Sequence, residues 1–194
     1  FCHIIADFYL QRFAWITCRN NNHFKSKGLL LHVASHFLVT LPILLLTGQI
    51  SMPGVLTVLG IVISHYLIDV WKSYKDERFR YFIIDQVLHL SVLIAAWALL
   101  SQFPPEPLQT RFAEFLNVGI LAILCTYLIV GRPTSFAISI ALGKYLTFAE
   151  KDSSEQVGLV LESRTVGYLE RYFIVTFILV EFFIGIGVLI VAKT

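Results

Sequence analysis

The sequence predicts an all-α protein: a polytopic membrane helix bundle of about five to six transmembrane helices and one short interfacial or re-entrant helix. Two observations on composition lead to this fold class. Hydrophobic residues make up 57% of the 194 residues and charged residues only 14%, whereas soluble domains carry about 25% charged residues. Mean hydropathy is +0.74. In addition, several apolar stretches approach the roughly 20 residues that a helix needs to cross a bilayer.

The first half of the chain predicts four apolar helices separated by polar connections. The first is expected to be short because its apolar stretch begins at the start of the sequence. The connections are expected at a polar stretch, a turn-rich stretch and a charged loop, because those segments lack apolar periodicity. The expected helices cover residues 1–17, 29–46, 55–71 and 81–100, and the connections cover 18–28, 47–54 and 72–80.

The second half predicts fewer regular elements. The proline-rich stretch at 101–110 cannot be helical throughout, so it makes a connection. A fifth helix is expected at 112–130, a short interfacial or re-entrant helix at 134–149, a solvated segment at 150–155 and a last helix at 165–192. With no fixed-period repeat and no Gly/Ser linker, residues 1–194 predict a single transmembrane domain. Its four-helix part covers 1–100 and its C-terminal helices cover 101–194.

Lys and Arg predict the orientation, because short cytoplasmic loops are enriched in these residues. If the second and third helices each cross once, the stretches at 18–28 and 72–80 lie on the same side. The connections on the opposite side, 47–54 and 101–111, contain Arg111 as their only basic residue. The basic side is therefore expected to be cytoplasmic. The basic residues of the two stretches are Arg19, Lys25, Lys27, Lys72, Lys75, Arg78 and Arg80.

Histidine and aspartate recur inside the predicted helices as pairs spaced i, i+4, which places both side chains on one helix face. Ionisable residues are costly inside a bilayer, so each is a functional hypothesis. Each of the first four helices carries one pair, and all four pairs are expected at a similar depth in the cytoplasmic half. The paired residues are His3 with Asp7, His32 with His36, His65 with Asp69, and Asp85 with His89.

Imidazole and carboxylate groups converging from four helices predict a divalent metal site, because bundle cores hold metals in this way. The donor types suit Zn²⁺, Fe²⁺ or Mn²⁺, and eight ligands could hold two ions. Two alternatives stay open: a metal-free polar network that joins the helices, and a proton or ion pathway. Three further side chains, Gln11, Lys72 and Gln86, could support the ligands or face a substrate. Lys72 also fits a lysine that extends its charge to the membrane surface.

Other function classes are not indicated. A net charge of +2 gives no basic field for nucleic acid, and the sequence has no P-loop, G-x-S-x-G, H-E-x-x-H or dinucleotide-binding motif. The expected partners are therefore the lipid bilayer and either a membrane-protein partner or further copies of the chain. Because the sequence starts with Phe1 rather than Met, we expect the encoded chain to extend beyond it.

The paired motifs resemble a family of bacterial integral membrane proteins catalogued as domain-of-unknown-function family 3307. The matching strings are HIIADFYLQ (3–11), LLLHVASHFLV (29–39), HYLIDVWKS (65–73) and FIIDQVLHL (82–90), with VGYLERYFI (166–174) near the C-terminus. The resemblance implies a bacterial inner (cytoplasmic) membrane location and supports the motif positions. It implies no reaction.

Two function hypotheses follow. The first is a metal-dependent hydrolase at the cytoplasmic membrane face that acts on a lipid or lipid-linked substrate through metal-activated water. Di-iron oxidative chemistry is a variant of it. The second is non-enzymatic: an accessory or structural subunit of a larger membrane complex, or a metal or proton conductor. Catalytic residues are not assigned by the sequence.

Overall fold

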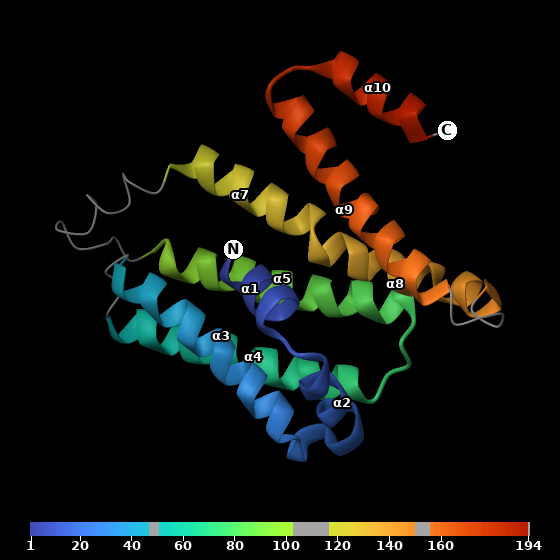
Figure 1. Cartoon of the computed structure of the whole chain (residues 1–194). Coiled ribbons are helices and arrows are strands. Elements are labelled where there is room, and N and C mark those ends of the chain that lie inside the picture. Colours follow the sequence, from blue (N-terminus) through green and yellow to red (C-terminus); the bar gives the residue numbers. More distant parts are fainter. Residues whose placement is uncertain (47–50, 103–116, 150–155, 194) are drawn as a thin grey trace. The chain divides into compact units, whose positions relative to one another are not determined.

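The computed structural model describes residues 1–46, 51–102, 117–149 and 156–193 (Figure 1). These residues form helices and no strands, which confirms the all-α class. The chain divides into two compact units, Phe1–Leu121 and Ala122–Thr194. The paired His and Asp residues all belong to the first unit. That the whole chain forms one domain stays a prediction.

The N-terminal segment differs from the predicted continuous helix. The first helix ends in a π-helical turn, closed by the bond from the Gln11 amide to the Ala6 carbonyl (3.1 Å). Gln11 and Arg12 are then extended, and the chain re-enters a helix at Phe13 that continues into the stretch predicted to be a polar connection. The prediction of one helix at 1–17 followed by a loop at 18–28 was therefore wrong. The elements are α1 (Cys2–Ile5), η1 (Ala6–Leu10), α2 (Phe13–Asn22) and η2 (His23–Lys25).

Three long helices follow where the sequence places them: α3 (Lys27–Leu46), α4 (Met52–Ser73) and α5 (Phe79–Leu100). Serine side chains cap the N-termini of α3 and α4. A serine hydroxyl oxygen just before a helix can accept a hydrogen bond from a backbone amide of the first turn, which has no partner within the helix. Ser26 Oγ accepts from the Leu29 amide (3.1 Å), and Ser51 Oγ accepts from the Gly54 amide (3.3 Å). These helices confirm the predictions at 29–46, 55–71 and 81–100.

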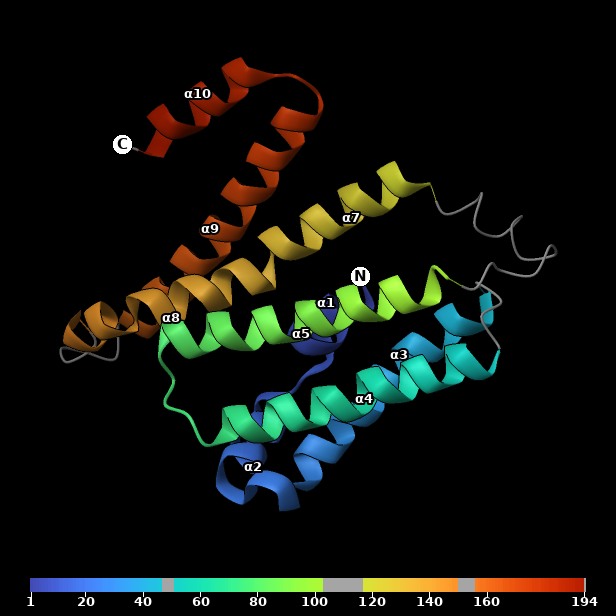
Figure 2. The same cartoon turned by 180° about the vertical axis from the view of Figure 1, so that it is seen from behind.

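In the first unit, α3 packs against α4, and α4 packs against α5, while α1 and η1 lie on α3 (Figures 1 and 2). The segment α2–η2 covers the end of the unit where α3 begins and α4 ends. There the Tyr66 hydroxyl donates to the Phe24 carbonyl (2.8 Å), and His23 Nδ1 lies 2.9 Å from Ser73 Oγ. The two basic stretches, 18–28 and 72–80, thus meet at one end, which is the arrangement that the charge pattern predicts.

The second unit contains most of α7 (Val118–Val130), α8 (Arg132–Ala149), α9 (Gln156–Leu179) and α10 (Phe183–Lys193). The predicted single helix at 165–192 is wrong, because the chain turns between α9 and α10 with Glu181 at φ 58°. Residues 112–116 and 150–155 of the predicted elements lie outside the described residues. Only Gly131 separates α7 from α8. Whether 134–149 lies at an interface stays a prediction.

Side chains satisfy the backbone groups that Pro133 leaves unpaired at the α7–α8 junction, since proline has no amide hydrogen to donate. The Thr134 hydroxyl donates to the Ile129 carbonyl (2.7 Å). From α9, Arg171 Nε donates to the Val130 carbonyl (3.0 Å) and Arg171 Nη2 to Ser135 Oγ (2.5 Å). These contacts explain how the helical path continues past a Gly-x-Pro sequence.

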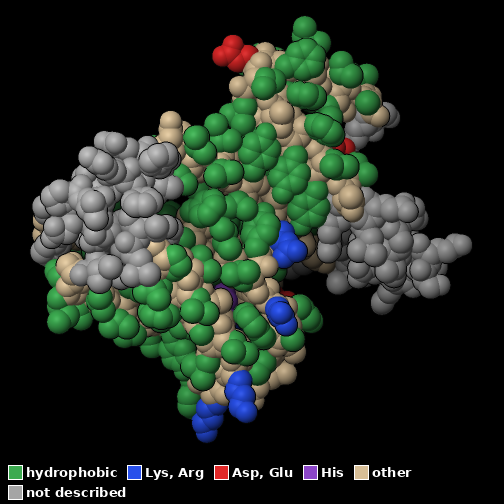
Figure 3. All heavy atoms as spheres, turned by 60° about the vertical axis from the view of Figure 1, so that its left-hand side comes forward, with side chains coloured by type: hydrophobic (Ala, Val, Ile, Leu, Met, Phe, Trp, Pro, Cys, Tyr) green, Lys and Arg blue, Asp and Glu red, His purple; other side chains and the backbone are tan. Residues whose placement is uncertain are grey.

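Three helical segments in the described part of the chain are long and apolar enough to cross a membrane: Met52–Ser73, Phe79–Leu100 and Val118–Gly143. Large hydrophobic side chains stay exposed along them, among them Leu67 and Leu90, at 59% and 56% exposure. Hydrophobic side chains cover most of the face shown in Figure 3. Contiguous apolar surface on this scale is typical of contact with lipid rather than water.

Candidate metal centre

Four helical segments of the first unit turn their paired His and Asp side chains toward one another. Their ligand atoms form three overlapping groups, each within 4.8 Å: His3, Asp7, His36 and His65; His32, His65 and Asp69; and Asp69, Asp85 and His89. All eight residues predicted as ligands are therefore brought together. On α3, α4 and α5 the paired residues are at most 8% exposed, because the i, i+4 spacing keeps them on the face that packs inward.

The second of these groups joins His32, His65 and Asp69. His32 Nε2 lies 3.1 Å from His65 Nε2, and Asp69 Oδ2 lies 3.5 Å from the former and 3.6 Å from the latter. Within the described residues, neither Asp69 Oδ2 nor His32 Nδ1 has a hydrogen-bond partner. An unpaired buried polar atom costs about 1–3 kcal/mol. A cation among the three atoms would remove that cost at the carboxylate.

Asp7 lies on the π-helical turn η1, and its carboxylate faces four imidazoles. Its Oδ1 is 2.6 Å from His36 Nε2, 3.4 Å from His32 Nε2 and 3.6 Å from His65 Nε2. The contact with His36 is as short as a charge-assisted hydrogen bond, with Nε2 donating to the carboxylate. The other carboxylate oxygen lies 3.5 Å from His3 Nε2. π-Turns often occur at functional sites, and this one carries the only Asp of the cluster outside α4 and α5.

His89 is held in one tautomer. Its Nδ1 lies 2.9 Å from the backbone carbonyl of Asp85. A carbonyl only accepts, so Nδ1 carries the hydrogen and the neutral ring keeps its lone pair on Nε2. That Nε2 is buried and has no hydrogen-bond partner in the part of the chain that the structure describes. Metal-binding histidines commonly donate their second nitrogen to a carbonyl in this way, so His89 is prepared to act as a ligand or a base.

The three auxiliary residues predicted from the sequence occupy different positions. Gln86 Nε2 donates to Asp85 Oδ2 (3.0 Å) and so orients a carboxylate of the cluster. Lys72 is half-buried near the end of α4, one turn beyond Asp69. Gln11 is half-buried at the extended break between η1 and α2. Only Gln86 therefore has a demonstrated hydrogen bond to one of the eight residues.

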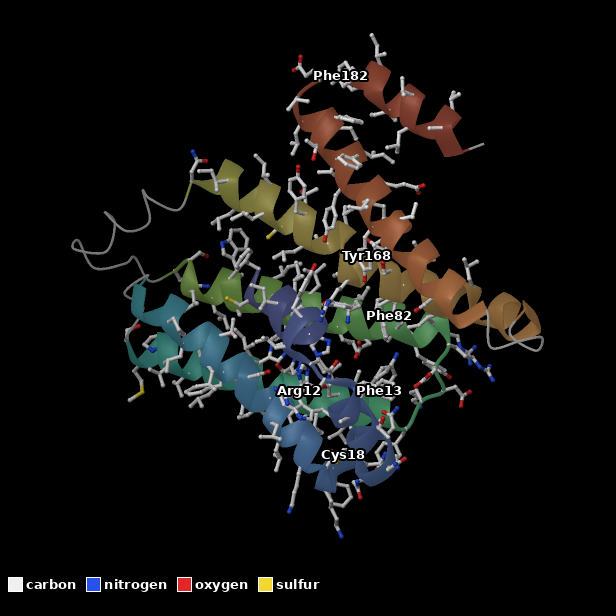
Figure 4. The ribbon with its side chains drawn as sticks, in the orientation of Figure 1. Arg12, Phe13, Cys18, Phe82, Tyr168 and Phe182 are labelled. Carbon is white, nitrogen blue, oxygen red and sulfur yellow. The ribbon has the colours of Figure 1, made fainter. Side chains whose placement is uncertain are left out.

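Sequence reasoning missed Arg19, which it placed in a solvated basic stretch. Arg19 lies on α2, and its Nη1 donates to Asp69 Oδ1 at 2.8 Å. The side chains are 12% and 5% exposed. Arg19 thus fixes one oxygen of Asp69 and leaves Oδ2 directed at His32 and His65. The break at Gln11 and Arg12, beside the exposed Phe13 in Figure 4, allows α2 to fold back over this end.

His23, the sixth histidine, lies apart from the cluster. The Ser73 hydroxyl donates to the Val70 carbonyl (2.7 Å), so Ser73 Oγ accepts from His23 Nδ1. The ring also stacks on Tyr74, with centroids 3.9 Å apart. His23 thus helps to attach η2 to the end of α4. It provides a matched control for the clustered histidines.

Comparison with known proteins gives a family but no activity. The family model described as "Protein of unknown function (DUF3307)" matches residues 1–118, a span that contains all eight clustered residues. No curated protein and no solved structure matched the chain. The match covers more than half of the 194 residues and confirms the resemblance seen in the motifs. The chain is a member of the DUF3307 family.

Proposed function

We propose that this protein binds a divalent metal ion inside a membrane-embedded helix bundle and uses it as a hydrolase. The observation that carries the proposal is the triangle of His32 Nε2, His65 Nε2 and Asp69 Oδ2, with sides of 3.1, 3.5 and 3.6 Å. Asp7 Oδ1 lies equally close to these two imidazoles, at 3.4 and 3.6 Å, but it accepts a hydrogen bond from His36. While that bond holds, three protein ligands leave a coordination position for water or substrate, which is the arrangement of catalytic rather than structural zinc sites.

The lengths of the triangle are compatible with a bound ion. Ligands at about 2.0–2.2 Å from a tetrahedral ion are about 3.3–3.6 Å apart, whereas octahedral neighbours are about 3.0 Å apart. Two of the three sides fall in the tetrahedral range and the third lies nearer the octahedral value. Two imidazoles and one carboxylate are the donor set of several catalytic zinc sites, so Zn²⁺ is the first ion to test. A second ion could be held by one of the other two groups, which are His3, Asp7, His36 and His65, and Asp69, Asp85 and His89.

The residues also support hydrolytic chemistry. A bound metal would lower the pKa of a coordinated water and polarise the bond to be cleaved. The chain would contribute Nε2 of His89, which carries the lone pair in the neutral tautomer that the Asp85 carbonyl selects, as a ligand or as the base that takes up the proton. Arg19 would keep Asp69 oriented.

One observation favours a metal-free polar network as the second candidate. The 2.6 Å contact between Asp7 and His36 is already a satisfied hydrogen bond, and it joins η1 to α3 without any ion. A conduit is less well supported, because the groups are gathered within short distances of one another rather than placed along a helix. On α4, for example, the clustered residues are His65 and Asp69, which are one helical turn apart, whereas a conduit needs groups along the whole helix.

The proposed setting is a bacterial inner membrane crossed five to six times, with the Arg19 end of the first unit in the cytoplasm. The three segments long enough to span support a membrane location. The 20-residue α3 and the 24-residue α9 would supply further passes. The meeting of the basic stretches at one end supports the orientation. Association with further copies, or with another membrane protein, stays a prediction.

Metal content tests the proposal directly. Protein purified in mild detergent without chelator is expected to contain about one equivalent of zinc by elemental analysis, with a second ion as the upper limit. His65→Ala should lose it, because His65 belongs to two of the three groups. His23→Ala should keep it, because that ring bonds Ser73 instead. A wild-type protein free of metal, with His65→Ala equally folded, would favour the polar network.

Arg19 offers a test of positioning. Arg19→Gln should weaken zinc binding by about 10–100-fold, the usual effect of removing a group that orients a ligand. Arg12→Gln is the matched control, since Arg12 lies seven positions earlier and is exposed, above the Trp15 ring. Competition with a chromophoric chelator at constant pH measures both affinities. Equal affinities in the two variants would show that Arg19 does not position the carboxylate.

A further inference from the structure

A cavity of about 330 Å³ lies beside the cluster in the first unit. Four imidazoles, those of His3, His36, His65 and His89, form part of its wall. Apolar side chains supply most of the remainder. They include Ile61 of α4, Val92 and Leu93 of α5, and Leu121. The cavity is at the lower end of the volumes of small-molecule sites, and its walls suit a hydrocarbon better than a water-soluble molecule.

The positions of the lining residues along each helix show in which direction the cavity extends from the imidazoles. On α3 it extends from His36 to Thr40, and on α4 from His65 back to Ile61. On α5 it extends from His89 to Leu93. Because α4 runs antiparallel to its neighbours, all three steps lead one helical turn away from the basic end where Arg19 lies. The imidazoles therefore lie between the charged end and the apolar part of the cavity.

A polar group belongs at the imidazole end. His89 is 3% exposed and lines the cavity, and its Nε2 has no hydrogen-bond partner among the described residues. Close to it are His3 and His65, with ring centroids at 5.0 and 4.3 Å. A molecule with a polar end at His89 and an apolar chain toward Leu93 would match both parts of the wall.

We propose that the cavity binds one acyl chain of a membrane phospholipid, with the polar end of that chain at the imidazoles. This inference rests on the proposed function and names its substrate class as acyl lipids. The bilayer favours this occupant, because phospholipids place the polar group near the surface and the chain toward the middle. The cavity has the same order, from the basic end to the apolar wall. Acyl chains are also the apolar ligand that surrounds α4 and α5 in a membrane.

Photo-crosslinking tests the proposal. The full chain is reconstituted into vesicles of phosphatidylethanolamine and phosphatidylglycerol that contain a phosphatidylglycerol with a diazirine in one acyl chain. Mass spectrometry after illumination compares labelling at Ile61 and Val92 with labelling at the exposed Leu67 and Leu90. We expect the cavity residues to be labelled at least as strongly. Leu93→Trp should reduce their labelling about tenfold, because the indole fills the space, whereas Ile94→Trp, on an exposed position, should not.

Metal content and thermal unfolding are measured on the same samples. Labelling restricted to Leu67 and Leu90, or equal cavity labelling in both tryptophan variants, would overturn the proposal. Cavity labelling by a diazirine polyprenyl phosphate but not by the phospholipid would overturn the choice of occupant. If zinc is bound and the cavity is unlabelled, the inference fails while the proposed metal centre stands. If the cavity is labelled but no zinc is bound, the metal proposal and the substrate role fail, while the acyl-binding site stands.

Discussion

Asp69→Asn is expected to release the metal and to lower the free energy of unfolding by about 3–5 kcal/mol, the usual cost of removing one partner of a buried ion pair. Asp69 carries two roles on its two oxygens. Oδ1 receives the Arg19 guanidinium at 2.8 Å, and Oδ2 completes the triangle with His32 and His65. Asparagine keeps the shape of the side chain but removes the charge that both contacts need.

Two measurements separate these roles. Unfolding in detergent reports stability, and elemental analysis reports metal. The control is Asp76→Asn, because Asp76 pairs with Arg78 on the surface at 67% exposure and exposed pairs contribute little. A double variant with Arg19→Gln should be less destabilised than the sum of the two single variants, by about 0.5–3 kcal/mol. Strict additivity would show that the ion pair contributes no stability.

Gly28→Ala is expected to destabilise the first unit by about 1–3 kcal/mol, as overpacking does in a close contact. A Cβ at Gly28 would lie 2.8 Å from both the Cα and the carbonyl oxygen of Trp15. These are backbone atoms of α2, so the helix itself must move. Since α2 carries Arg19, the same change should weaken zinc binding.

Gly60→Ala is the matched control for this prediction. Gly60 lies in the interior of α4 and is exposed, with nothing within 4 Å of an added Cβ. Alanine there should raise stability by about 0.5–1 kcal/mol, because glycine is a poor helix former. Opposite signs for the two variants in thermal unfolding would support a close α2–α3 contact. A stable Gly28→Ala variant with unchanged zinc affinity would contradict it.

Much of the first unit could be predicted because the sequence features that specify it involve residues close together in the chain. Apolar stretches fix the position of α3, α4 and α5 to within a few residues. The i, i+4 spacing placed His65 with Asp69, and Asp85 with His89, on buried helix faces. Patterns of this kind depend on neighbouring residues along the chain, so the sequence displays them directly. That these groups bind metal is still a proposal, because spacing specifies geometry and not occupancy.

The parts that the sequence did not reveal depend on distant contacts. No glycine or proline marks the break at Gln11 and Arg12, so the apolar pattern continues through it. After the break, the α2–η2 segment is held by contacts with α4, about 40 to 50 positions later in the sequence. Arg19 donates to Asp69, and the Phe24 carbonyl accepts from Tyr66. The turn at Glu181 likewise requires a positive φ in a residue that rarely adopts one. Arg19 lies in a stretch that resembles a basic loop, so the sequence gave no sign of its contact with Asp69.

The overlap of the three ligand groups limits how ions could fill them. His65 belongs to the first and second groups, and Asp69 to the second and third. An ion that takes His65 or Asp69 into its coordination changes the donors left for the next ion. Binding constants for two ions would therefore be linked, each depending on whether the other is present. A zinc titration of such a centre would follow two unequal, interdependent steps, and substitution of one shared residue would alter both.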